Sequence, residues 1–202
     1  MSQLARLVLV GIGAFSLSAG AQVIDFESGG LQYRTQTKNG VTVMVAPMPL
    51  VVREYSVIQV AVSNGALVSW TVKPEDFTFT RQDGAAFRGS AARKVVDSLV
   101  DKAGRNDVIN LVSTYEQGLY GMNRLRSTNG YETRRQAALA EVSSTRLKAA
   151  AAASAIAFVQ TKLAPGESTD GAVFFSTAGR PMGSGSLTVR TAGEVFEFRL
   201  TE

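Results

Sequence analysis

The chain has 202 residues, of which 45% are apolar and 19% charged, and a net charge of +4 at pH 7. These values predict one globular domain with its own apolar core, and the charge is too small to indicate nucleic-acid binding. The chain contains no histidine and no cysteine. This excludes Ser-His-Asp and Cys-His nucleophiles, histidine-based zinc or copper sites, and disulfide bonds.

The first 21 residues are typical of a secretory signal peptide. Arg6 supplies a positive charge, Leu7–Leu17 is an apolar run, and Ala19–Ala21 provides small residues at the cleavage site. We therefore predict cleavage before Gln22 and a secreted or periplasmic mature protein, with a retained membrane anchor as the alternative. A secreted chain without cysteine favours a bacterial envelope over a disulfide-stapled domain.

Alternating apolar residues predict strands through the N-terminal half. Leu31–Thr37 and Val41–Pro47 flank an Asn-Gly turn and predict a β-hairpin. The polar segment Gln22–Gly30 is predicted to be a lead-in without a strand. The remaining predicted strands of this half are Tyr55–Ser63, which is apolar on both faces and therefore central, Leu67–Val72 and Phe77–Thr80.

From about residue 90 to residue 155 the apolar spacing changes to that of helices. We predict a first helix capped by Ser90, a second that begins near Asn106, and a third that runs from about Glu132 into the alanine-rich Leu147–Ala155. Their apolar stripes are too narrow to form a core alone. The segment is therefore predicted to be a helical insertion within one domain of residues 22–202.

The strand spacing returns at Ile156. Ile156–Ser176 is predicted to form two strands around a Pro-Gly turn, and Phe175 is predicted to lie deep in the core. Gly179–Gly185 has the glycines of a phosphate loop but lacks the Gly-Lys-Ser/Thr ending, so it is interpreted as a hairpin connection. Ser186–Thr191 and Val195–Leu200 then predict a final hairpin.

Together these elements predict a mainly β fold, an immunoglobulin-like antiparallel β-sandwich of seven to nine strands with a helical insertion. Two segments also carry a family resemblance. Leu163–Phe175 (LAPGESTDGAVFF) and Val57–Phe79 (VIQVAVSNGALVSWTVKPEDFTF) resemble the corresponding strands of small exported bacterial immunoglobulin-like domains of uncharacterised function. The resemblance extends over Tyr55–Thr80 and Leu163–Leu200, about a third of the chain, and implies the fold, but it implies no functional residues.

Few residues stand out as candidates for a site. Four arginines in the insertion can form a weak anion-binding patch or, alternatively, a solvated helix face: Arg124, Arg126, Arg134 and Arg135. Trp70 can stack on a sugar or peptide if exposed, although its alternating position favours the core. The scattered carboxylates lack the spacing of a calcium loop, so no metal and no cofactor is predicted.

The predicted function is that of a non-catalytic binding or scaffolding protein of the bacterial envelope. Its partner is predicted to be an unidentified envelope protein or glycan, and exposed strand edges would suit strand addition by such a partner. One alternative is a peripheral membrane-surface or polyanion-binding protein that uses the basic insertion. Another is an accessory domain of an envelope enzyme system, which would need two carboxylates, or a serine and a lysine, to converge.

Overall fold

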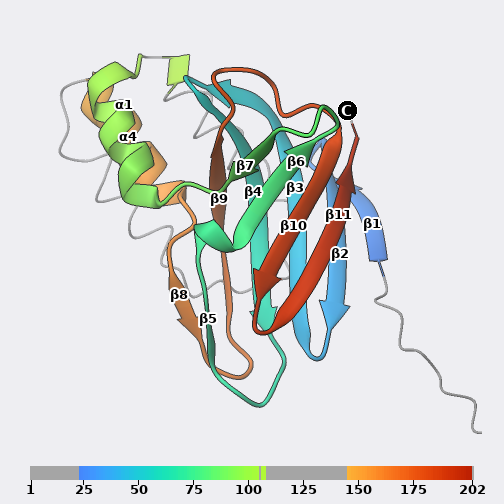
Figure 1. Ribbon diagram of the computed structural model, residues 1–202. Coiled ribbons are helices and arrows are strands. Elements are labelled where there is room, and N and C mark those ends of the chain that lie inside the picture. The colour runs from blue at the N-terminus through green and yellow to red at the C-terminus, as the bar shows by residue number, and fades with distance from the viewer. Residues whose placement is uncertain (1–22, 105, 108–144, 202) are drawn as a thin grey trace, which may run out of the picture.

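The computed structural model describes residues 23–104, 106–107 and 145–201 (Figure 1). The protein is mainly β, with antiparallel strands in three sheets. The strands are β1 (Val23–Ser28), β2 (Leu31–Lys38), β3 (Val41–Val52), β4 (Tyr55–Asn64), β5 (Trp70–Val72), β6 (Phe77–Arg81), β7 (Ala86–Arg88), β8 (Thr161–Leu163), β9 (Ser168–Ser176), β10 (Gly185–Thr191) and β11 (Glu194–Leu200). The described helices are α1 (Ala92–Lys102), α4 (Thr145–Ile156) and the short η1 (Pro74–Asp76).

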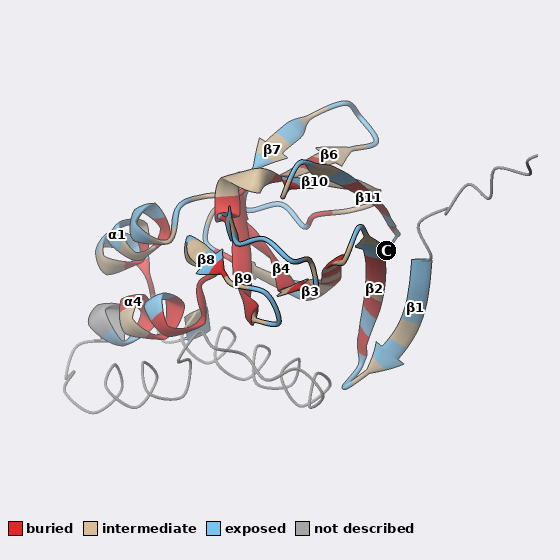
Figure 2. Cartoon of the chain, turned by 90° about the horizontal axis from the view of Figure 1, so that it is seen from below, coloured by how far each residue is buried: buried red, intermediate tan, exposed pale blue. Residues whose placement is uncertain are grey.

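Two large sheets face each other around the main core. One has the strand order β1-β2-β3-β4-β9 and the other β11-β10-β6-β7, while β5 and β8 form a small third sheet. The main core takes valines from β3 and β4 on one side and Phe77, Phe79, Phe196 and Phe198 on the other. In this sandwich-like arrangement strands such as β10 and β11 bury alternate side chains toward the core (Figure 2).

A second apolar layer lies between the other face of the five-stranded sheet and the two helices. Tyr55, Val57 and Phe174 of the sheet pack with Val95 and Leu99 of α1 and with the alanines of α4. Alanine has no atoms beyond Cβ, so α4 can approach its neighbours closely. Because β4 and β9 are covered on both faces, they are buried along almost their whole length.

Two of the hairpins predicted from turn residues are confirmed. Asn39 and Gly40, which join β2 to β3, have φ angles of 46° and 79°, and Ala192 and Gly193, which join β10 to β11, have 52° and 76°. Two successive positive φ angles give the tight turn whose twist matches that of the paired strands. The central position of β4 and the inward face of β11 are also confirmed.

Two predictions in the N-terminal half are wrong. Gln22–Gly30 is not a strandless lead-in, because β1 pairs with β2 from Val23↔Gln36 to Ser28↔Leu31. An edge strand is held by backbone pairing and needs little apolar burial, which explains its polar sequence. The strand predicted at Leu67–Val72 begins only at Trp70, so Val68 lies in a loop rather than on the core side.

Three further predictions need correction. Ile156 ends α4, and the first strand of the predicted pair is only β8, which joins β5 and not β9. Gly179–Gly185 connects β9 to β10 in opposite sheets and is therefore a crossover, not a hairpin. Ser90 does not cap α1 with its side chain, since the amide of Ser90 donates to the carbonyl of Phe174 at 2.8 Å and the N-cap is Ala91.

The described part of the chain has eleven strands, more than the seven to nine expected, because β1 and the three-residue strand β7 were not among the predicted strands. The second predicted helix lies almost entirely outside the described residues, as does the first half of the third. Within the predicted insertion, α1 and the alanine-rich α4 are both present and pack against each other.

The β3–β4 turn fastens α1 to the sheet. Ser98 Oγ donates to Glu54 Oε1 at 2.6 Å, and Lys102 Nζ lies 3.6 Å from the same oxygen. Next to it, Arg53 Nε lies 2.8 Å from Asp107 Oδ2. Burial alone would raise the pKa of Glu54, but the Ser98 hydrogen bond, the backbone and Lys102 outweigh it and lower this pKa.

We expect Phe175→Ala to lower the free energy of unfolding by about 3–5 kcal/mol, because the ring is fully buried in the main core. Chemical denaturation measures the loss. The control is Val195→Ala, whose side chain is 41% exposed and whose truncation should change stability by less than about 0.5 kcal/mol. A loss below about 1 kcal/mol for Phe175→Ala would contradict its place at the centre of the core.

We expect Glu54→Gln to lower stability near neutral pH by about 1 kcal/mol, the order expected for a hydrogen bond to a charged, partly exposed group. The folded-state pKa is below the ordinary value of 4.5, so the advantage of the wild type is complete above that pH. It disappears as the pH falls through the lowered pKa. Denaturant titrations across this range, with the exposed Asp97→Asn as control, check the prediction; a difference independent of pH would contradict it.

Candidate functional site

An extended segment of a partner could pair with the backbone of a strand at the margin of a sheet. The first such edge, that of β9, is covered. The amide of Ser90 donates to the carbonyl of Phe174 at 2.8 Å, and the amide of Phe158 donates to that of Ala172 at 2.9 Å. The Phe158 backbone lies so close that a Cβ on Gly171 would be 2.7 Å from the Cα of Phe158. No further strand can therefore be added along this part of β9.

The edge of β11 is covered by side chains of β2. Gln36 Nε2 donates to the carbonyl of Glu197 at 2.5 Å, and Lys38 Nζ donates to the carbonyl of Val195. The Lys38 ammonium also lies 5.5 Å from the centre of the Phe196 ring. Polar side chains thus occupy backbone acceptors that an additional strand would need.

The edge of β7 is short. The strand has three residues, Ala86–Arg88, and Arg88 Nε donates to the carbonyl of Glu75 at 2.7 Å. The two strands of the small sheet are equally short, with three residues each. Such lengths offer too few backbone groups to bind a strand specifically.

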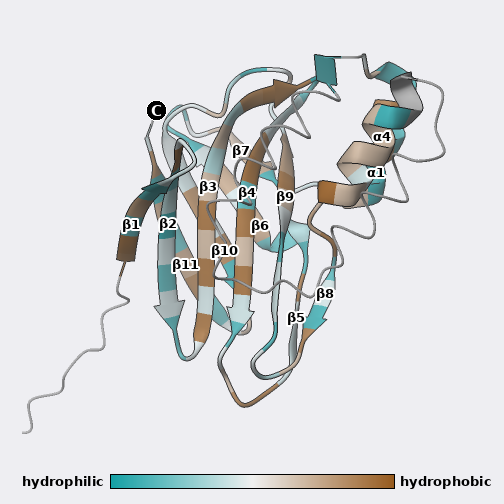
Figure 3. Cartoon of the chain, turned by 180° about the vertical axis from the view of Figure 1, so that it is seen from behind, coloured by the Kyte–Doolittle hydropathy of each residue, from teal (hydrophilic) through white to brown (hydrophobic). Residues whose placement is uncertain are grey.

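The outer edge of β1 is different. This strand has six residues, pairs with β2 on one side, and has no strand beside its other edge within the described chain. Figure 3 shows β1 at the margin of the sheet, with its most hydrophobic colour at the first residues. Val23 and Ile24 have 52% and 50% of their surface exposed. Among the strands at the margins of the described sheets, β1 is the longest for which we find no such cover.

The two faces of β1 differ in chemistry. Ile24 and Phe26 share the apolar face, where the Phe26 ring stacks on Tyr33 with centroids 5.1 Å apart and planes 9° apart. Burial raises the pKa of Tyr33 to about 12, so its phenol remains neutral. Asp25 and Glu27 lie on the opposite, acidic face.

Cross-strand contacts on the acidic face show which side chains complement it. Arg34 Nε of β2 lies 3.9 Å from Asp25 Oδ2, and Gln32 Nε2 donates to Glu27 Oε2 at 2.9 Å. A neighbouring strand on the open side would meet the same carboxylates, so basic and amide side chains suit that position.

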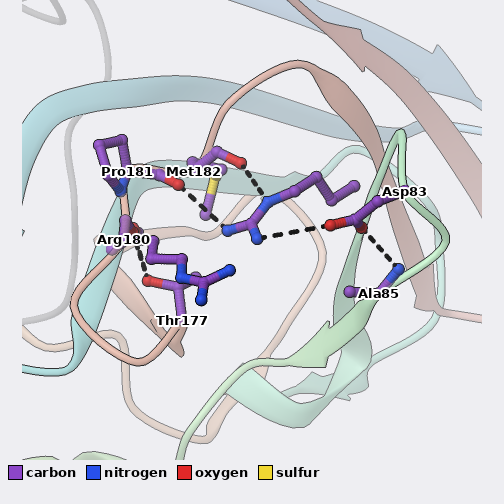
Figure 4. A network of polar contacts seen from close by, with 8 residues as sticks. Asp83, Ala85, Thr177, Arg180, Pro181 and Met182 are labelled. Carbon is purple, nitrogen blue, oxygen red and sulfur yellow. Dashed lines mark hydrogen bonds and ion pairs between the residues drawn. The ribbon is translucent and has the colours of Figure 1, made fainter.

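At the start of β10 a polar network holds the glycine-rich crossover Gly179–Gly185 (Figure 4). Arg81 donates from Nε to the carbonyl of Met182 at 3.3 Å and from Nη2 to that of Pro181 at 3.1 Å, and it lies 3.8 Å from Asp83. Thr177 Oγ1 donates to the backbone of the same loop at 2.6 Å. Carbonyls bound by arginine do not resemble the outward amides of a phosphate loop.

Two surface hollows lie at the two ends of β10. One of about 370 Å³ contains Asp76, Arg190 and Glu194, and the other, of about 310 Å³, lies beside Arg81. Burial raises the pKa of Asp76, whose Oδ2 accepts the amide of Lys73 at 3.0 Å. Asn39 Nδ2 of the β2–β3 turn donates to Glu194 Oε1 at 2.6 Å. Asp76 therefore stabilises a local turn, whereas Glu194 joins the start of β11 to the β2–β3 turn.

In the described part of the chain, Ser98 and Lys102 both contact the carboxylate of Glu54. The Ser98 hydroxyl donates to Glu54, and the lowered pKa of that acid makes it a weak base near neutral pH. This geometry anchors a helix; it does not activate a nucleophile.

The residues predicted for a site are not brought together. Arg124, Arg126, Arg134 and Arg135 lie outside the described residues. Trp70 is partly buried against the main core, and its Nε1 has no hydrogen-bond partner in the described part. Within that part no three acidic side chains are grouped to hold a metal ion. The sequence analysis did not predict the edge of β1. The available signal was the alternation of apolar Ile24 and Phe26 with acidic Asp25 and Glu27.

No protein-family model, curated protein or solved structure matches the chain. In the part of the chain that is described, no helix combines the length and the apolar character needed to cross a membrane. Function must therefore be inferred from the chain's own surface chemistry, in which the open edge of β1 is the most developed binding feature.

Proposed function

We propose that the chain is a non-catalytic binding protein of the bacterial envelope that takes an extended segment of a partner protein onto the outer edge of β1. The observation that supports this most directly is the contrast between edges. Those of β9 and β11 are covered, that of β7 is short, and β1 is open over six residues. Strand addition uses backbone hydrogen bonds for affinity and alternate side chains for specificity.

The partner segment should alternate between apolar residues and basic or amide residues. Apolar side chains would extend the surface of Ile24 and Phe26, and basic ones would face Asp25 and Glu27. This is the chemistry of β2, the strand already paired with β1. A second copy of β1 is a poor occupant, because antiparallel pairing of two such strands gathers four carboxylates on one face.

The proposed location and family rest on the sequence. Residues 1–21 have the pattern of a signal peptide, and the absence of cysteine suits a bacterial envelope protein. The resemblance of Leu163–Phe175 and Val57–Phe79 to exported immunoglobulin-like domains agrees with two facing antiparallel sheets. Within this proposal the fold is an immunoglobulin-like sandwich whose N-terminal strand is a docking edge.

A peptide with the sequence of Leu31–Lys38 provides a defined probe. We expect it to bind weakly and to slow amide hydrogen exchange along Val23–Ser28, because new hydrogen bonds form on that edge. Ile24→Lys should lower the affinity about tenfold or more, since it removes an apolar cross-strand contact and adds a charge to the edge. Titration calorimetry or nuclear magnetic resonance measures the affinity.

Val195→Lys is the matched control. It makes the same charge change at a 41% exposed valine on β11, whose edge is covered, and should leave the affinity unchanged. A peptide in which basic residues are replaced by glutamate should bind less well to the wild type. Equal losses in both lysine variants, or exchange protection away from β1, would contradict the proposed site.

A further inference from the structure

The loop between β4 and β5 exposes two aliphatic side chains. Leu67 is 94% exposed and Val68 67%, more than Val23, Ile24 or Val195. Exposure of two adjacent branched aliphatic side chains has a cost in water that a merely connecting loop need not bear.

The loop is held in a defined shape. The side chain of Asn64 is fully buried, donates to the carbonyls of Val68 at 2.9 Å and Leu163 at 3.0 Å, and accepts the amide of Ala66 at 3.0 Å. The amide of Gly65 donates to the β2–β3 turn at 2.7 Å. The exposed pair is therefore presented by a pre-organised loop, which reduces the entropy lost on binding.

The chain enters the fold at this same end. The loop touches the β2–β3 turn through Gly65 and Gly40, and Val23 pairs with Gln36 just before that turn. In the sequence, five residues separate Val23 from the apolar run Leu7–Leu17. Five residues span at most about 17 Å, so an inserted apolar run would hold this end of the sandwich near the bilayer.

We propose that, in the chain that keeps residues 1–21, before cleavage or as a retained anchor, this end of the protein contacts the phospholipid surface, with Leu67 and Val68 inserted between headgroups while the N-terminal apolar run is in the membrane. A protruding aliphatic pair offers little of the roughly 1,000 Å² that a specific protein interface buries. Shallow insertion needs no such area, and two weak anchors together hold a protein that one holds only reversibly. Lys162 of β8 is exposed beside β5 and can reach headgroup phosphates.

Because the chain has no cysteine, single-cysteine labelling tests the contact in the full chain. A polarity-sensitive fluorophore at Val68→Cys should shift to the blue on mixed phosphatidylcholine and phosphatidylglycerol vesicles. The same label at Gln82→Cys, in the β6–β7 turn at the opposite end of β10, should not shift. An unshifted label at position 68 on vesicle-bound protein would overturn the proposal.

A second measurement uses unlabelled protein. Leu67→Asn combined with Val68→Asn should speed release from vesicles about tenfold, with little change at high salt, since the lost contact is apolar. Both side chains are exposed, so the variant should fold normally. An unchanged release rate would overturn the lipid assignment. So would a fluorophore at position 68 that shifts with lipid-free envelope proteins but not with vesicles. Ile24→Lys should leave the label shift intact, which separates this surface from the proposed strand-binding edge.

Discussion

The pairing of β4 with β9 is the constraint on which the rest of the structure depends. Nine residue pairs join the two strands, from Tyr55↔Ser176 to Ser63↔Ser168. One face of the pair, with Ile58 and Val173, completes the main core, and the other, with Val57 and Phe174, receives the helices. A slip of one residue would exchange the two faces, so both apolar layers enforce the same register.

Because the central pair is covered on both faces, another strand could be added to the described sheets at their margins. The chain closes these margins by different means: a close backbone approach at β9, and side chains of β2 at β11. Because β2 already reaches the opposite sheet through Gln36 and Lys38, β1 lies beyond the sandwich proper. Within the described residues no strand pairs with its outer edge.

The sequence was informative wherever structure is decided locally. The Asn39-Gly40 turn and the alternation of Phe196 and Phe198 predicted two hairpins and their buried faces correctly. Which edges are covered could not be predicted, because the cover comes from residues distant in the chain: Gln36 and Glu197 are 161 positions apart. The strand predicted at Leu67–Val72 also failed at Val68, because strand periodicity cannot show that the buried Asn64 side chain binds the Val68 carbonyl and bends the chain into a loop.

The direction of β1 connects the two proposed surfaces. β1 begins at the end that carries Leu67 and Val68 and runs away from it, since Val23 pairs with Gln36 beside the β2–β3 turn. A partner strand added antiparallel to β1 would run toward that end, as β2 does on the other side. If this end faces the bilayer, the captured segment would approach the membrane with its C-terminal side. A partner whose alternating segment directly precedes a membrane anchor would then satisfy both surfaces at once, whereas a segment anchored on its N-terminal side would need a reversed path.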